Sequence, residues 1–430
     1  MKNAMEGPTA RPRIPAAVLD SGLASAATFL SGLFAARALS IYELGTYALV
    51  FAAFSLAALI PTHLLFAPFE VNAVALPRGQ RLRLLWNSFP PAVPTALCSA
   101  ATLVGCALAL PPSTPFSVVV ALISTGIVLS FVSPIQDHLR RMFHLDGGSW
   151  RAALISAIHF GIVAVTLLVC KVSDTPPAWA PLGALALGNA VSLLSGLCLV
   201  PTSCRSRLER PVRLAPLLRT GVHLLLAAVV PSAATFLAAA IVARAAGAAV
   251  LGYAEASRLV AQPIFVFSVA LGAVLGPHSV EAARRRSPDE AGRVSLEYRG
   301  WFTGVGVAYL LLTGSRSGWN PLVSLLPNAF LISWLVPVSV LANLANGIVF
   351  PQRSELLGAG RATALLSVEV IGNAVRVIIA SAAPVIGAFA IPIGLTALGL
   401  LRWPGYLWAL RGHYGTATGA PVPRLAPLSD

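Results

Sequence analysis

Three polar residues lie close together in an otherwise apolar stretch near the C-terminal end of the chain. Glu369, Asn373 and Arg376 have the spacings of four, three and seven residues that place side chains on one face of a helix. Ionisable groups are costly inside a membrane and often mark pathways for ions or substrates. The pattern predicts a polar stripe in which Arg376 and Asn373 bind an anionic substrate and Glu369 binds a proton or sodium ion. In the alternative interpretation, the acid and the arginine neutralise each other and join helices.

A second acid–arginine combination occurs at Glu255 and Arg258, three residues apart in another apolar segment. Side chains three positions apart meet on a helix surface. In the structural interpretation, the two residues form an ion pair that stabilises the fold. In the functional interpretation, Arg258 binds substrate and Glu255 takes part in ion coupling.

Composition shows which elements must carry these residues. The chain has 430 residues, 57% of them hydrophobic and 11% charged, whereas soluble domains carry about 25% charged residues. A soluble fold would expose extensive apolar surface, which soluble monomers avoid, so the sequence predicts an all-α polytopic membrane protein. About twelve transmembrane helices are expected, near residues 15–37, 45–67, 86–110, 116–135, 152–170, 180–200, 221–243, 250–275, 300–314, 328–350, 362–383 and 385–401, of which the ninth is the shortest.

The distribution of basic residues predicts the orientation. With the N-terminus inside, 24 of the 30 Lys and Arg residues fall in inside segments. Only four fall outside, namely Arg37, Lys171, Arg244 and Arg316. This bias follows the positive-inside rule and places both termini in the cytoplasm. The net charge of +14 is therefore mainly a topology signal, and it gives no reason to expect nucleic acid as a partner.

The chain also contains an internal repeat. The stretch Ser-Ala-Ala-Thr-Phe-Leu at 25–30 recurs at 232–237, an offset of 207 residues. The same offset relates Arg37 to Arg244 and the Leu-Gly pair at 44–45 to that at 251–252. Each half has six helices, an even number, so both halves enter the membrane in the same orientation. Parallel repeats of this kind hold substrate between the halves.

The repeat adds three candidate site residues. A weaker match, at an offset of 210, aligns His159 with Glu369, so His159 is either a second protonatable group or a hydrogen-bonded packing residue. Arg37 and Arg244 lie at the expected outer ends of helices. They are either interfacial anchors or contacts for the anionic head group of a substrate.

Several of these residues belong to motifs that resemble a known family. The segment at 36–49, ARALSIYELGTYAL, resembles the "AR-x-L-x-x-x-E-x-G-x-Y-A-L" signature of polysaccharide flippases of the multidrug/oligosaccharidyl-lipid/polysaccharide exporter superfamily. The stretch LGYAEASRL at 251–259 followed by Pro277, the pair Gly360-Arg361 and IGAFA at 386–390 are similar to later parts of these O-antigen-type (Wzx-like) proteins. Twelve helices also fit this branch, since the lipid II flippases usually have fourteen.

The resemblance implies two six-helix bundles around a central cavity and alternating access. It implies export of a polyprenyl-diphosphate-linked oligosaccharide across a bacterial inner membrane, with H⁺ or Na⁺ coupling and glycan polymerases as possible partners. The planar fork of an arginine suits a diphosphate. The expected organisation is a first lobe at 1–205, a basic cytoplasmic linker at 206–220, a second lobe at 221–412 and a tail at 413–430.

Other function classes find less support in the sequence. There is no nucleophile elbow, Walker A loop or HExxH motif, and no polar segment long enough for a soluble catalytic domain. We expect no enzyme activity, cofactor or metal. Two alternatives stay open: a drug or metabolite antiporter of the same fold, which should show unpaired acids in its cavity, and a membrane polysaccharide polymerase or ligase, which usually needs a large outer loop.

Overall fold

The computed structural model describes residues 13–74, 76, 80–173, 175–205, 214–314, 325–330, 332 and 334–414. Across these ranges the chain is helical and contains no β-strand. The α-helices are α1 (Arg13–Ala38), α2 (Ile41–Ala57), α3 (Ala67–Val74), α4 (Gln80–Ala107), α5 (Phe116–Asp146), α6 (Ser149–Val172), α7 (Ala180–Cys198), α8 (Leu214–Ala245), α9 (Ala248–Arg284), α10 (Pro288–Gly314), α11 (Leu335–Gly347), α12 (Phe350–Gly358), α13 (Ala362–Ala380), α14 (Ala383–Ile386) and α15 (Ala390–Tyr414). A π-helix, η1 (Ile60–Phe66), and four 3₁₀ turns, η2 (Pro177–Trp179), η3 (Thr202–Cys204), η4 (Asn328–Phe330) and η5 (Gly387–Phe389), connect them.

Each of the twelve predicted segments contains α-helix among its described residues, which confirms the all-α polytopic fold. Eleven helical runs in the described part of the chain are long and apolar enough to cross a membrane. In these runs α2, η1 and α3 form one unit, α11 and α12 another, and α14 and α15 a third. The predicted ninth segment, the shortest, lies in α10 and is not among these eleven runs. The first turns of α10 carry the charged residues that precede the apolar stretch at 300–314.

Several boundaries differ from the sequence-based expectation. The helix α8 begins at Leu214, so residues 214–220 of the expected linker are already helical. The rest of that linker, 206–213, lies outside the described residues, as do 415–430 of the tail and 315–324 of the loop before the tenth segment.

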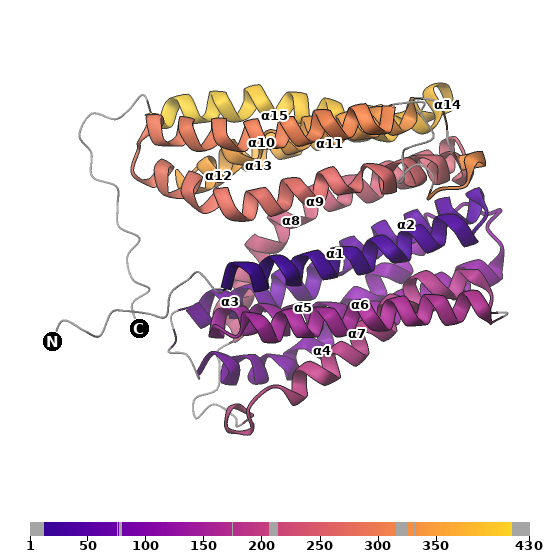
Figure 1. The fold of residues 1–430 in the computed structure, drawn as a ribbon, viewed down its shortest axis with the longest axis horizontal. Coiled ribbons are helices and arrows are strands. Elements are labelled where there is room, and N and C mark those ends of the chain that lie inside the picture. Colours follow the sequence, from indigo (N-terminus) through magenta and orange to yellow (C-terminus); the bar gives the residue numbers. More distant parts are fainter. Residues whose placement is uncertain are drawn as a thin grey trace.

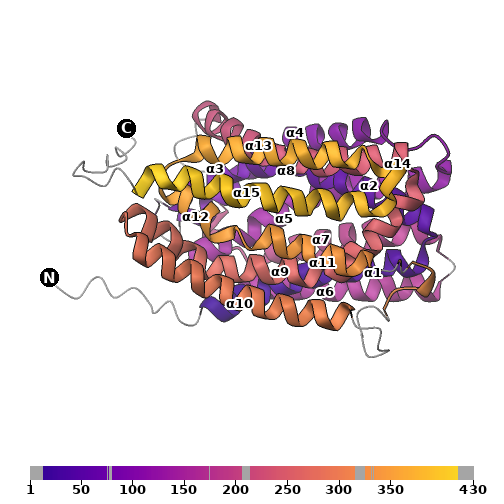
Figure 2. The same cartoon turned by 90° about the horizontal axis from the view of Figure 1, so that it is seen from above.

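The helices gather into two lobes. In Figure 1, α1 to α7 (indigo to magenta) form one group and α9 to α15 (salmon to yellow) form the other, while α8 lies between them. The long helices run roughly parallel in Figure 2, with α3 and α12 toward one end of the bundle and α14 at the other. The helix α8 packs against α13 and α9 of its own half and also against α2, η1 and α3 of the first half.

The lobes meet directly where α2 and α9 begin. A Cβ atom added to Gly45 would overlap the carbonyl oxygen of Ala248, and one added to Gly252 would overlap the carbonyl oxygen of Ile41. Glycine permits such close approach of two helix backbones in a membrane. Ile41 and Ala248 are themselves 207 residues apart, as are the two glycines. The contact is therefore reciprocal, as a parallel repeat requires.

One hydrophobic core continues through this contact and includes buried residues of both halves, such as Leu44, Leu49, Leu251 and Val260. On the outside of the bundle, large apolar side chains such as Ile378 and Leu400 are more than half exposed. An apolar exterior around a closely packed interface suits a protein whose outer surface contacts lipid.

Candidate functional site

A cavity of about 260 Å³ lies between the lobes. Its first wall is α2, which contributes the small residues Ala48, Ala52 and Ser55. Its other walls are α8, α9, α13 and α15, all from the second half. The charged lining residues and the hydroxyls beside them are Glu255, Arg258, Arg376, Ser232 and Thr235. We call this space the central cavity. It brings together three of the charged residues that the sequence singled out.

Glu255 and Arg258 form the ion pair predicted from their spacing. The Nη2 atom of Arg258 lies 2.6 Å from Oε1 of Glu255, and its Nε donates to Oε2 at 2.7 Å. Such a two-point arrangement fixes both side chains. The acid is 7% exposed and the arginine 43% exposed, so the guanidinium can still be reached from the cavity.

Arg376 lies in the same cavity without an acid of its own. Its Nη1 donates to the Thr235 hydroxyl at 2.9 Å. No described residue accepts a hydrogen bond from its Nε, and no described carboxylate forms an ion pair with it. With Glu255 balancing Arg258, the cavity carries an excess of one positive charge. A cation that is only partly satisfied in a low-dielectric site favours an anionic ligand.

Glu369 has a different arginine as its partner. The expected structural alternative paired it with Arg376, but its carboxylate accepts hydrogen bonds from Arg402 and Tyr406 of α15 and from Asn373 at 3.3 Å. Arg402 also donates to the side chain of Asn346. Glu369 and Asn373 are both buried. The three residues of the predicted stripe therefore have different surroundings. Glu369, with Asn373 beside it, joins α13 to α15 and, through Arg402, to α11. Of the three, only Arg376 lines the central cavity.

His159 lies in a second polar space, inside the first lobe. This space, of about 260 Å³, is lined by residues of α1, α2, α5, α6 and α7, and we call it the first-lobe chamber. Its polar lining includes Ser25, Thr28, Gln136, Arg140, His159 and Asn189. The histidine is buried, and it fits beside Gly188, where a Cβ would press on its ring. The structure therefore places His159 and Glu369 in separate lobes, neither of them among the residues that line the central cavity.

Beside the chamber lies a buried cluster that sequence reasoning did not identify. At its centre is Asp20 of α1, which is only 4% exposed. It accepts hydrogen bonds from Arg140 at 2.8 and 2.9 Å, from Ser156 at 2.6 Å, and it lies 3.0 Å from the ring of His144. These contacts join α1 to α5 and α6. An acid in an apolar helix is a signal for such a cluster, but its partners are more than 100 residues away in sequence.

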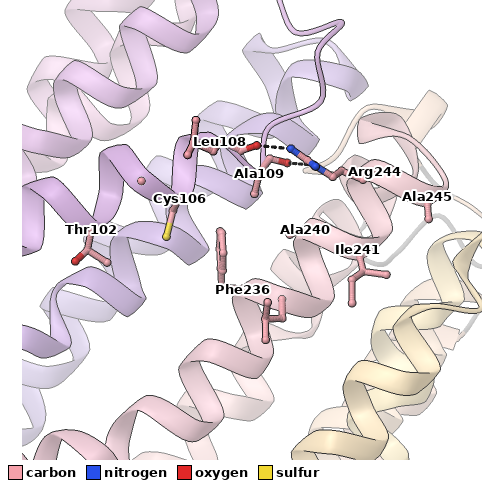
Figure 3. Close-up of a pocket in the computed structure, with 11 residues that line it drawn as sticks. Thr102, Cys106, Leu108, Ala109, Phe236, Ala240, Ile241, Arg244 and Ala245 are labelled. Carbon is pink, nitrogen blue, oxygen red and sulfur yellow. Dashed lines mark hydrogen bonds between the residues drawn. The ribbon is translucent and has the colours of Figure 1, made fainter.

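The helix-end arginines occupy neither space. Arg37 donates through Nε to the carbonyl oxygen of Leu325 in the second half at 2.5 Å. Arg244, in turn, donates to the carbonyl oxygens of Leu108 and of Ala109, the latter at 3.0 Å, just after α4 of the first half (Figure 3). Each arginine of the repeated pair thus reaches into the opposite half. These reciprocal bonds, with the α2–α9 contact, hold the lobes together at the end expected to be outside.

The motif at 36–49 has structural roles in this arrangement. Ser40 and Glu43 form a capping box that begins α2: the Ser40 hydroxyl accepts from the Glu43 backbone N–H, and Oε2 of Glu43 accepts from that of Ser40 at 2.9 Å. Gly45 makes the close contact with α9, and Tyr47 is buried. The signature therefore builds the junction between the lobes and does not itself supply the charged groups of the central cavity.

Comparison with known proteins identifies the fold. No family model and no curated protein matches the chain. Among solved structures, a multidrug resistance MATE family transporter of the MOP superfamily in its inward-facing conformation matches with a TM-score of 0.72 and 15% identity, over 92% of this chain and 96% of that one. The outward-facing conformation of such a transporter gives 0.65 at 14% identity, over 95% and 96%.

A lipid II flippase, MurJ, in an inward closed conformation matches with a TM-score of 0.66 and 12% identity, over 93% of this chain and 87% of that one. MOP denotes the superfamily that the sequence motifs resemble. These identities are low, so the matches establish architecture and do not distinguish the O-antigen branch from others. The chain is a multi-pass membrane protein with the fold of MOP superfamily transporters.

Proposed function

We propose that this protein is a transporter that moves a polyprenyl-diphosphate-linked oligosaccharide between membrane leaflets by alternating access. The observation that carries the proposal is the excess positive charge of the central cavity, where Arg376 has no acid partner among the described residues and Arg258 is accessible beside Glu255. Arginine binds phosphate through two parallel N–H donors. In this proposal Arg376 receives the diphosphate, and Arg258 joins it when the anion competes with Glu255.

The neighbouring groups fit the rest of such a head group. The hydroxyls of Ser55, Ser232 and Thr235 line the same cavity and can exchange hydrogen bonds with sugar hydroxyls. Small residues such as Ala48 and Ala239 leave space between the helices. The polyprenyl chain would stay in the bilayer, because its transfer into a polar cavity would expose apolar surface.

The relative arrangement of the lobes supports alternating access. The lobes are joined by Gly45 and Gly252 and by the reciprocal arginine bonds, all at the end expected to be outside. These contacts support a state in which the lobes are closed at that end. Opening of the central cavity at that end would require the two lobes to separate at these contacts.

For ion coupling, three acids or bases remain candidates: Glu255, Glu369 and His159. Glu255 has the most direct route, because it lines the central cavity and contacts Arg258. A proton bound to Glu255 would release Arg258 and raise the positive charge available to an anionic substrate. Glu369 and His159 would have to act through movements of α13 or of the first lobe.

The first test measures export. Deleting the gene should leave lipid-linked sugar on the cytoplasmic side, and Arg376→Ala should abolish its export while membrane levels stay normal. Arg376→Lys, which retains the charge but not the planar fork, should restore export in part. Normal surface polysaccharide in the deletion strain, in the absence of a paralogue, would refute the proposal. Full export by Arg376→Ala would remove that residue from the mechanism.

A drug or metabolite antiporter is the second candidate, because two of the similar structures are multidrug resistance transporters. A cationic drug would need an available acid in the cavity, yet Glu255 is already paired with Arg258. The two candidates differ in ligand charge. Binding of an organic cation that weakens in Glu255→Gln and is unchanged in Arg376→Ala would favour the antiporter.

A further inference from the structure

A third space, which is apolar, lies on the outside of the molecule, where the two lobes meet between α4 and α8. This groove has a volume of about 740 Å³. One wall consists of Gly105 and Cys106 at the end of α4 and of Ala109 just after it. The other wall consists of Phe236, Ala240 and Ile241 on α8 (Figure 3). The walls belong to different halves, so a molecule in the groove would contact both lobes at once.

The walls suit a hydrocarbon chain. The Thr102 hydroxyl is already used in a hydrogen bond to the carbonyl oxygen of Cys98 at 2.9 Å, so it presents little polarity to the groove. Gly105 leaves open space in the groove, because a Cβ atom added there would meet nothing within 4 Å. The adjacent side chains of Leu108 and Leu237 are 80% and 47% exposed, as expected for residues that face lipid.

A fixed cation closes one end of the groove. Arg244 lies in the last turn of α8, and its Nε donates to the carbonyl oxygen of Ala109 at 3.0 Å while its Nη2 donates to that of Leu108. These bonds use two of the five N–H donors of a guanidinium. The residue is exposed, so a ligand can reach the guanidinium. A positive charge held at the end of an apolar groove is complementary to an anionic amphiphile.

We propose that this groove binds an anionic phospholipid from the leaflet adjoining the beginnings of α2 and α9, with an acyl chain along the groove and the phosphate on Arg244. The groove is distinct from the central cavity, because α8 separates them. Phe236, Ala240 and Ile241 face the groove, whereas Ser232, Thr235 and Ala239 face the cavity. The inference therefore holds whichever substrate the cavity carries. Because the lipid bridges α4 and α8, it stabilises the state closed at this end.

The test is lipid binding by the purified full-length protein in detergent, measured by native mass spectrometry with phosphatidylglycerol and with phosphatidylcholine. Wild type should retain phosphatidylglycerol and release phosphatidylcholine. Loss of a charge-assisted hydrogen bond should make phosphatidylglycerol bind about tenfold more weakly to Arg244→Gln. Arg37→Gln is the matched control, since it removes the equivalent arginine and inter-lobe bond but no groove residue, and it should bind as wild type.

A second variant tests the groove without touching Arg244. Gly105→Leu should fill the space without strain and should displace the lipid, while thermal unfolding in lipid-free detergent stays unchanged. Equal retention of both lipids by wild type, or equal losses in Arg37→Gln and Arg244→Gln, would overturn the proposal. So would unchanged lipid retention by Gly105→Leu, or equally strong binding of glycerol phosphate, which has the head group but no chain.

Discussion

The first helix of each half contains the same six residues, yet the two copies face different spaces. In α1, Ser25 and Thr28 line the first-lobe chamber. In α8, the equivalent Ser232 and Thr235 line the central cavity, where Thr235 accepts a hydrogen bond from Arg376. The same local sequence thus contributes to an internal space in one half and to the space between the lobes in the other.

Residues outside the repeated stretch explain this difference. Asp20 ties α1 to α5 and α6 within the first lobe, and the position 207 residues later is Ala227, which offers no such bond. The helix α8 instead packs against the first half. There Gly221 lies so close to Leu64 of η1 that a Cβ atom would overlap the Leu64 backbone. Pro231 also interrupts the hydrogen-bond ladder of α8.

The comparison shows that a duplicated sequence does not imply a duplicated site. Helix α1 is fixed within one lobe, whereas α8 contacts both, so only the second copy is placed where a substrate between the lobes would lie. Three single substitutions test this distinction, and each is paired with a control substitution elsewhere in the chain.

The largest effect should come from Asp20→Asn, which leaves the buried guanidinium of Arg140 with only its partly exposed partner Asp137. Breaking a buried ion pair costs about 3–5 kcal/mol, so the free energy of unfolding should fall by an amount near the lower end of that range. Thermal unfolding in detergent measures the change. Glu281→Gln, which breaks the exposed pair with Arg285, should leave the unfolding temperature almost unchanged. Equal shifts in the two variants would mean that Asp20 does not anchor α1.

A smaller effect is expected from Gly221→Leu, because the new side chain would collide with the backbone of η1. Overpacking costs about 1–3 kcal/mol, and here it would also push α8 away from the first lobe. The transport rate should therefore fall further than the loss of folding stability alone would explain. The control is Gly22→Leu in α1, where a Cβ meets nothing within 4 Å. If both variants transport equally well, the packing of α8 against the first lobe has no part in function.

The smallest effect should come from Thr235→Val, which removes the hydroxyl that accepts from Arg376. The guanidinium would keep its charge but lose its fixed position, so affinity for the anionic substrate should fall roughly fivefold, about 1 kcal/mol. Thr235→Ser should restore it. Thr28→Val, at the equivalent place in α1, should leave substrate affinity unchanged. A loss of affinity in Thr28→Val but not in Thr235→Val would reverse the assignment of the two spaces.

Much of the architecture could be predicted because it depends on local and repeated features. Apolar segment length gives the helices, and the offset that relates Gly45 to Gly252 and Arg37 to Arg244 gives two parallel halves. Helix spacing likewise gives the Glu255–Arg258 pair. Each of these inferences needs only residues on one helix, or a comparison of two stretches of sequence.

Only the tertiary structure decided which charges are satisfied. Periodicity places Glu369, Asn373 and Arg376 on one face of α13, but it does not reveal that Arg402 of another helix takes the acid and leaves Arg376 in the cavity. Nor does sequence show that Asp20 meets Arg140 far along the chain. The sequence by itself determined the membrane fold and the charged candidates. The packing of helices distant in sequence decided which of these charges became structural pairs and which line the space between the lobes.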